Sequence, residues 1–206
     1  MTRPFASWWL AAALVATLAS CAALTREAPV KQSFLVEPSS PPALAKPLPV
    51  SARVGTVTVA GAFRDRSFVV RESELRYETD FYHEFAVPPA AMIGEAIARA
   101  FDRANLFSRM IAPGTAPEAD FVIDAFVSAL YADRRDPQKP AAELAMTLYV
   151  SRADRPGAPV WSREYRRRVP LAAASAEAYA EAQSRALSEI LAEATRDLAA
   201  AAEALR

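Results

Sequence analysis

The pattern that most constrains the fold is the regular alternation of side chains over residues 142–150. Alternation with a period of two residues is typical of a strand that is buried on one face only. One face carries Leu144, Met146, Leu148 and Val150, and the other carries Glu143, Ala145, Thr147 and Tyr149. A strand of this kind needs neighbours in a sheet and a second layer that covers its apolar face.

Other segments are typical of further strands and of two helices. We expect strands over residues 54–59, 67–71, 74–77, 121–127 and 160–169. The first helix begins at Pro88-Pro89 and ends near Asn105, and the second runs from Ser175 to about Leu205. Each helix carries one apolar stripe. The sequence therefore predicts an α+β fold, a two-layer sandwich with a mostly antiparallel sheet and two helices packed on one face.

The N-terminal segment has the features of a targeting signal. Arg3 precedes an apolar run over residues 8–18, and small residues follow at 19 and 20. Leu18-Ala19-Ser20-Cys21 resembles the bacterial lipobox, which implies cleavage before Cys21 and attachment of lipid, such as palmitate, to that cysteine. Because Cys21 is the only cysteine, it cannot form a disulfide within the chain. The alternative is an uncleaved anchor helix over residues 5–24, although the apolar run is short for a membrane span.

The residues after Cys21 suggest how the domain is tethered. Lipoproteins that stay in the inner membrane commonly carry Asp at the next position, so Ala22 implies the outer membrane. Prolines recur between residues 29 and 49 and favour an extended chain. We expect a signal peptide over 1–20, a lipidated cysteine and Pro-rich tether over 21–50, and a folded domain over 51–206. Residues 33–37 are either a first strand or simply part of the tether.

Charge and motif content exclude several classes of function. The chain has 24 basic and 24 acidic residues, so no strong field favours nucleic acid. His83 is the only histidine, which excludes a multi-histidine metal site. Neither the glycine-rich phosphate loop nor the serine nucleophile elbow occurs. We expect a protein that is not an enzyme and that has no cofactor besides lipid at Cys21. Asp133 and Asp136 are expected to face solvent in a polar loop.

The strand over residues 160–169 is one candidate partner-binding segment. Aromatic and arginine side chains of this kind are enriched at protein interfaces. One face of the strand carries Trp161, Arg163, Tyr165 and Arg167. This face is either a docking surface for an acidic partner or phosphate headgroups, or an ordinary solvated sheet face whose charge nearby acids balance.

The segment over residues 71–85 is the second candidate, because it mixes aromatic and charged side chains without a regular period. Its candidate partner-binding residues are Arg71, Tyr77, Phe81 and Phe85. The alternative is that Tyr77 and Phe85 pack under the first helix as part of the core.

Several local stretches resemble one family. They are Val69-Val70-Arg71, Leu75-Arg76-Tyr77, Phe85 through Pro88-Pro89, Leu106-Phe107 and Ala119-Asp120-Phe121. Together with the long C-terminal helix, they are similar to the ABC-type transport auxiliary lipoproteins that accompany MCE-domain lipid transporters. Phe85 departs from the family pattern, where Trp is common. The resemblance implies an outer-membrane lipoprotein that docks a periplasmic MCE-domain protein and an inner-membrane ABC transporter.

Two other functions fit the same pattern. One is a periplasmic lipid-binding carrier, and the other is an outer-membrane assembly lipoprotein that partners a β-barrel. Fold class alone does not separate these alternatives. Exposed edge strands or the alanine-rich second helix would also suit a homo-oligomer.

Overall fold

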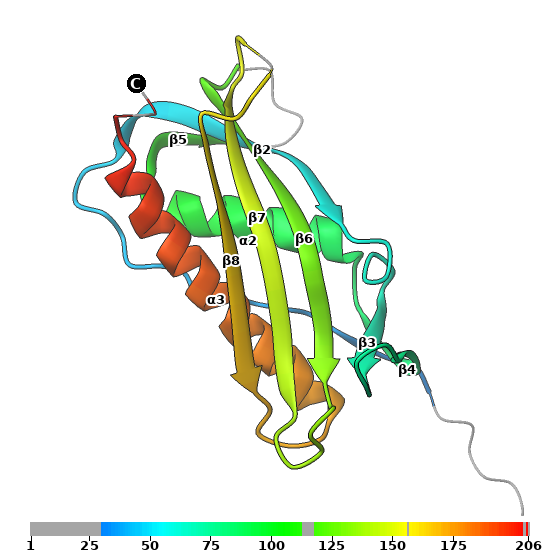
Figure 1. Ribbon diagram of the computed structural model, residues 1–206. Helices are drawn as coiled ribbons and strands as arrows, with labels where there is room; N and C mark the ends of the chain where they lie inside the picture. The colour runs from blue at the N-terminus through cyan, green and yellow to red at the C-terminus, as the bar shows by residue number, and fades with distance from the viewer. Residues whose placement is uncertain (1–29, 113–117, 156, 204, 206) are drawn as a thin grey trace, which may run out of the picture. The chain divides into compact units, whose positions relative to one another are not determined.

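The computed structural model describes residues 30–112, 118–155, 157–203 and 205. A compact unit spans Lys31–Arg206 (Figure 1). Its elements are β1 (Gln32–Phe34), β2 (Leu48–Val59), β3 (Ser67–Arg71), β4 (Tyr77–Phe85), α2 (Pro89–Arg103), β5 (Phe107–Ile111), β6 (Phe121–Asp133), β7 (Ala141–Arg152), β8 (Trp161–Pro170) and α3 (Ala176–Ala200). The predicted order of strands, helix, strands, helix is thus confirmed.

The eight strands form one sheet in which β6 has two neighbours on the same edge. β2 pairs with β6 from Phe121 to Val127, and β3 pairs with its last two residues, Ala132 and Asp133. β5 continues the sheet beyond β2, while β4 and then β1 continue it beyond β3. On the other edge of β6 lie β7 and then β8. The sheet therefore forks at β6.

The α+β fold class is confirmed, but the prediction of a mostly antiparallel sheet is wrong because the sheet is mixed. The pairs β3–β4, β6–β7 and β7–β8 are antiparallel. The pairs β1–β4, β2–β5, β2–β6 and β3–β6 are parallel. Antiparallel partners here follow one another through short turns, whereas β2 meets β5 and β6 only after the chain has crossed over through α2. The pattern of apolar residues in a strand does not reveal this crossover connection.

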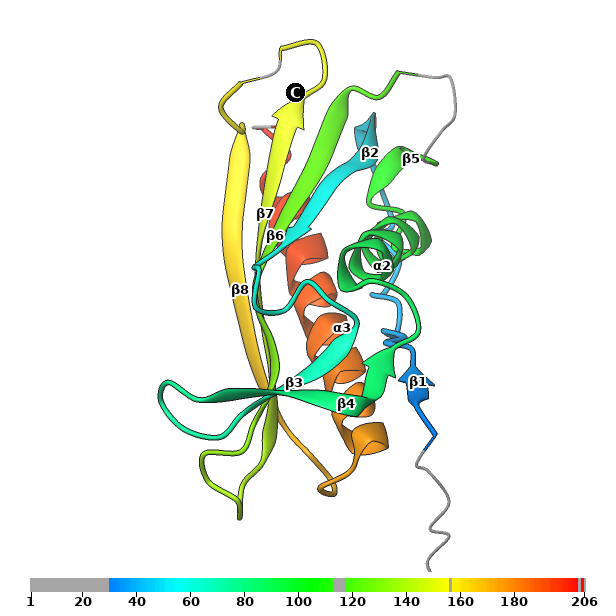
Figure 2. The ribbon, with the colours of Figure 1, turned by 90° about the vertical axis from the view of Figure 1, so that its right-hand side faces the viewer.

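Both helices cover the same face of the sheet, as predicted (Figure 2). α2 packs on β2 and β5, and α3 packs on β7 and β8. Leu144, Met146 and Leu148 of β7 point into the layer between sheet and helices and are fully buried. They belong to the same buried hydrophobic cluster as Ile97 of α2 and Leu187 of α3. The apolar face predicted for residues 142–150 therefore forms part of the core.

The helix ends follow local chemistry. α2 starts with Pro89 at a position where a missing N–H costs nothing. Asn105 after its end has a positive φ of 52°, the left-handed conformation expected of it. At α3 the hydroxyl of Ser175 accepts the N–H of Ala178 at 3.2 Å, as expected for an N-cap. α3 ends at Ala200, five residues before the predicted end.

The segment before β2 packs on the domain, whereas its prolines predict a tether over residues 21–50. β1 occupies Gln32–Phe34, near the strand considered for residues 33–37. The N–H of Glu37 donates to Ser184 Oγ at 3.1 Å, and the N–H of Ser39 donates to Ser188 Oγ at 2.9 Å. Proline prevents regular helix here, but α3 hydroxyls accept these two backbone donors and hold the segment on the domain.

Two strand assignments also differ from expectation. β4 begins at Tyr77, where the strand predicted over 74–77 ends, because residues 72–76 form the turn from β3. β5 is absent from the predicted elements, since its five residues, FSRMI, are too few to show a period. Among the described residues, no helix has the length and apolar character required to cross a membrane.

Candidate functional site

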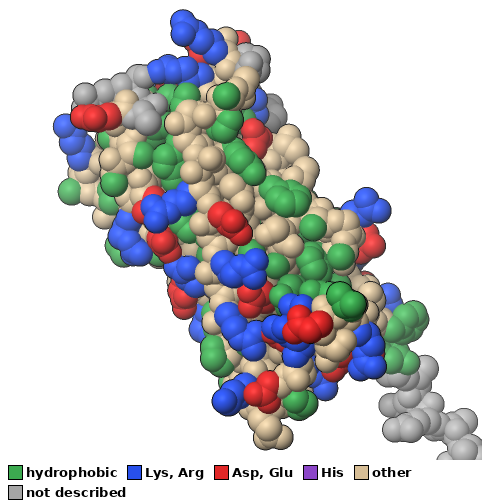
Figure 3. All heavy atoms as spheres, in the orientation of Figure 1, with side chains coloured by type: hydrophobic (Ala, Val, Ile, Leu, Met, Phe, Trp, Pro, Cys, Tyr) green, Lys and Arg blue, Asp and Glu red, His purple; other side chains and the backbone are tan. Residues whose placement is uncertain are grey.

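The face of β6, β7 and β8 that points away from the helices is not covered by a second layer (Figures 1 and 3). We call it the outer face. From β7 it displays Glu143, Ala145, Thr147 and Tyr149, and from β8 it displays Ser162, Glu164, Arg166 and Arg168. Basic and acidic side chains gather at one end of this face, where β3 joins β6, and apolar ones lie elsewhere on it (Figure 3).

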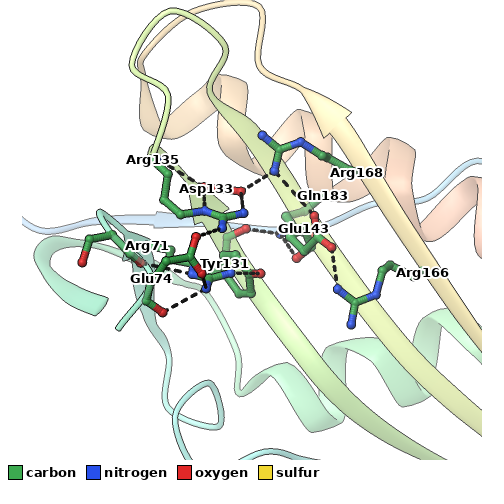
Figure 4. Close-up of polar contacts among 10 residues, drawn as sticks. Arg71, Glu74, Tyr131, Asp133, Arg135, Glu143, Arg166, Arg168 and Gln183 are labelled. Carbon is green, nitrogen blue, oxygen red and sulfur yellow. Dashed lines mark hydrogen bonds and ion pairs between the residues drawn. The ribbon is translucent and has the colours of Figure 1, made fainter. Parts of the chain in front are cut away.

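Asp133 is the centre of the charged end. Its side chain is only 1% exposed, although it ends β6 at the start of a polar loop. Arg135 binds it with two nitrogens, Nε at 3.0 Å and Nη2 at 2.8 Å, and Arg168 of β8 binds the same carboxylate (Figure 4). Hydrogen bonds from Arg135 and then from Arg168 outweigh burial and hold the pKa of Asp133 well below its usual range.

Glu143 on β7 provides the second buried carboxylate. Arg166 Nη1 lies 2.9 Å from its Oε1, and Arg168 Nη1 lies 3.8 Å from its Oε2. Arg168 therefore bridges Glu143 and Asp133, which lie on neighbouring strands (Figure 4). The guanidinium groups of Arg166 and Arg168 remain largely exposed above these acids. They are charged donors held in fixed positions on the outer face.

The β3–β4 turn adds an aromatic part to this cluster. The guanidinium of Arg71 lies 5.4 Å from the ring centre of Tyr77 and 6.0 Å from that of Tyr131. The two tyrosine rings meet edge to face, with centres 5.5 Å apart. Glu74 then pairs with both Arg71 and Arg135 (Figure 4). Arg71 and Tyr77, which the sequence placed in one candidate segment, thus lie together beside Asp133.

The other predicted residues of that segment separate. Phe85 is fully buried against Phe68, so the core alternative describes it and it cannot contact a partner directly. Phe81 is exposed on β4, away from the Asp133 cluster. Cys21 lies outside the described residues.

The four residues proposed on the strand over 160–169 face inward. Tyr165 is buried and its hydroxyl donates to Asp197 of α3 at 2.9 Å. Arg163 lies 3.0 Å from Asp197, and Arg167 pairs with Glu189 at 3.1 Å and with Glu193. Trp161 is partly buried against the core. The acids that pair with this face belong to α3, which agrees with the alternative of a face whose charge nearby acids balance, and Arg163 keeps about half of its side chain exposed.

Of the residues in this cluster, only Arg71 and Tyr77 are predicted from the sequence as partner-binding residues. Arg166 and Arg168 lie on the face of β8 opposite to the one predicted to bind a partner. Asp133 is buried, whereas the sequence predicts that it faces solvent. The signal available was the pairing of an arginine-rich strand with Glu143 on its neighbour. The sequence alone does not show which of the two faces of β8 is covered by α3.

The two buried acids of the cluster are paired charges. Asp133 and Glu143 are both hydrogen-bonded to arginine, and the lowered pKa of Asp133 keeps that carboxylate ionised near neutral pH. Among residues 30–112, 118–155, 157–203 and 205, no group of three or more His, Cys, Asp or Glu side chains could hold a metal ion. Asp80 and His83 form a separate pair at 2.7 Å on β4.

The family is decided by comparison with known proteins. The model of the ABC-type transport auxiliary lipoprotein component matches residues 35–194. The chain belongs to this family. The match confirms the resemblance read from the sequence and includes residues 35–50, which pack on the domain. It assigns the chain to lipoproteins of ABC-type transport and not to an enzyme family. No curated protein matches the sequence.

Solved structures share the fold. The protein XCC0632 from Xanthomonas campestris has 18% sequence identity and a TM-score of 0.71, and the match covers 80% of this chain and 92% of that one. An uncharacterized protein has 10% identity and a TM-score of 0.59, with 77% and 99% covered. At these identities the likeness concerns the fold alone.

Proposed function

We propose that this protein is a periplasmic docking component of an MCE-type lipid transport system, anchored in the outer membrane through lipid on Cys21. Membership in the family of ABC-type transport auxiliary lipoproteins is the observation that carries the proposal. Anchoring at Cys21 is supported by the lipobox-like sequence before it and by Ala22 after it. The partners would be an MCE-domain periplasmic protein and, through it, the inner-membrane ABC transporter.

The outer face is the surface that we assign to docking. Phe126 of β6 projects from it and is 39% exposed, while Arg166 and Arg168 supply charged donors at its end. An uncovered sheet face with an aromatic residue and fixed arginines has the composition of an interface centre. The opposite face of the sheet is filled by the helices, and its largest side chains are fully buried. This packing favours a docking domain over a carrier that encloses lipid.

The proposal is tested by affinity purification from gently solubilised membranes. The wild-type protein should recover an MCE-domain protein together with ABC subunits. The variant Cys21→Ala should lose the membrane fraction and recover much less of both, because the anchor supplies local concentration. Recovery of β-barrel assembly proteins instead, or lipid in stoichiometric complex with the purified domain, would favour the other two functions and contradict the docking role.

A further inference from the structure

β4 contains a bulge that turns two aromatic side chains out of the sheet. Its pairing with β3 shifts register between Ser67 and Val69, which leaves residues 80–83 of β4 without partners in the ladder with β3. Asp80 holds this bulge: its Oδ1 accepts the N–H groups of Tyr82 at 2.8 Å and His83 at 3.0 Å. A bulge with a dedicated side-chain cap is a built feature that redirects side chains.

The bulge displays Phe81 and Tyr82 on the surface. Phe81 is 70% exposed and Tyr82 is 40% exposed. Their rings pack edge to face with centres 5.2 Å apart, and Lys31 Nζ lies 5.0 Å from the centre of the Phe81 ring. Folding leaves the Phe81 ring largely in water and the Tyr82 side chain partly so. Adjacent aromatic rings beside a lysine match the residues that settle at the headgroup level of membranes.

The chain enters the domain beside this aromatic pair. β1 lies along β4 with Gln32 opposite His83, which brings Lys31 next to Phe81. Lys31 follows Cys21 by ten positions. A fully extended chain of that length spans at most about 36 Å. With lipid on Cys21, Phe81 is therefore confined to the neighbourhood of the bilayer surface.

The charges around the pair do not oppose contact with phosphate headgroups. Glu84 is bound by Arg66 at 2.6 Å and by Lys31 at 3.6 Å, and Asp80 is paired with His83 at 2.7 Å. Lys31 remains about half exposed, so its ammonium group can contact a lipid phosphate on its solvent side, while Arg66 still binds Glu84. The acids near the rings thus have cationic or hydrogen-bonding partners already.

We infer that Lys31, Phe81 and Tyr82 form a membrane-contact site that inserts into the headgroup region of the phospholipid bilayer. The inference rests on the proposed acylation of Cys21. Lipid on Cys21 limits only the distance of the domain from the membrane, whereas two inserted rings also restrict its orientation. β4 then faces the bilayer, and the domain presents a constant orientation to its periplasmic partners.

A single tryptophan at position 81 tests this inference in the mature, acylated protein. Trp161 is the tryptophan that remains after cleavage before Cys21, and it pairs with Val150, at the end of β7 remote from β3 and β4. Wild type therefore reports on a remote position. The double variant Phe81→Trp with Trp161→Phe reports on the bulge. Both are incorporated into vesicles of phosphatidylethanolamine and phosphatidylglycerol, with or without brominated acyl chains.

We expect brominated lipid to reduce the emission of Trp at position 81 about twofold and to leave Trp161 of wild type unchanged. Emission typical of water, without quenching, in protein that floats with the vesicles would overturn the membrane-contact site. Quenching only in vesicles made from native membranes, and not from pure lipid, would assign the rings to a protein partner and overturn it equally. Failure of the wild-type protein to float would instead contradict acylation, and with it the proposed function.

Discussion

Arg168 on β8 reaches across β7 to bind the carboxylate of Asp133 at the end of β6. One ion pair thereby joins strands that are not neighbours in the sheet. Arg135, from the loop that follows β6, binds the same carboxylate from the other side. The charged end of the outer face is thus part of the folded framework, and its arginines are held in place without a partner protein.

Removal of the Asp133 charge should destabilise the fold. Asp133→Asn keeps the shape but weakens the hydrogen bonds from Arg135 and Arg168. Because both guanidinium groups retain contact with water, the loss should be about 1–3 kcal/mol, less than for a fully buried pair. Urea unfolding measures the change. The matched control Asp136→Asn, at an exposed position of the same loop, should change stability by less than about 0.5 kcal/mol.

The Asp133 carboxylate should also make the domain less stable as the pH falls. The pKa of Asp133 is lower in the folded protein than in the unfolded chain. Its contribution is therefore complete above the unfolded value of about 4 and is lost as pH falls toward the lower folded value. The difference in unfolding free energy between wild type and Asp133→Asn should be constant from neutral pH down to about 5 and shrink in more acidic solution. A difference that grows on acidification would contradict this assignment.

Tyr165 should contribute through its hydrogen bond to Asp197. In Tyr165→Phe the carboxylate of Asp197 keeps its ion pair with Arg163, so the loss should be modest, about 0.5–1.5 kcal/mol. Burial, and then the bond to Asp197, raise the pKa of Tyr165. Because the folded state holds this proton more tightly, wild-type stability should fall above about pH 10, and less steeply in the variant. Thermal unfolding at pH 7 and pH 11 checks both.

Gly55 lies where β2 changes register against β6, between Val54 and Val57. A β-carbon at this position would overlap the carboxylate of Asp124 and the side chain of Val122. We expect Gly55→Ala to destabilise the domain by about 1–3 kcal/mol, the usual cost of overpacking. At Gly61 an added β-carbon meets nothing, so Gly61→Ala should change stability by less than about 1 kcal/mol. Equal effects in denaturant unfolding would show that steric overlap is not the cause.

Much of the fold could be predicted because local patterns and tertiary packing agree. The alternation over residues 142–150, the stripe of α2 and the cap at Ser175 each report a local preference that the structure retains. The mixed sheet could not be read in the same way. Parallel pairing of β2 with β5 and β6 depends on contacts between residues far apart in the chain, and a strand pattern carries no information about its partner.

The candidate site was predicted less well than the fold. Both faces of β8 carry arginine, so the sequence does not show which face points toward the helices. The sequence predicts Tyr165 and Arg167 on a partner surface, yet they face α3, and Arg166 and Arg168 face outward. Inward arginines are tolerated because Asp197, Glu189 and Glu193 lie on the helix above them. Only the placement of that helix distinguishes the two faces.

The most direct test of the docking role compares two substitutions at equally exposed apolar positions. Phe126 on the outer face is 39% exposed, and Val160, just before β8, is 38% exposed. Affinity purification from solubilised membranes, with partners quantified by mass spectrometry, measures the effect of glutamate at each. Phe126→Glu should reduce recovery of the MCE-domain protein and ABC subunits at least about tenfold, as for a central interface residue, whereas Val160→Glu should recover them like wild type. Undiminished recovery with Phe126→Glu would contradict docking through the outer face, and wild-type protein that recovers neither partner would contradict the docking role itself.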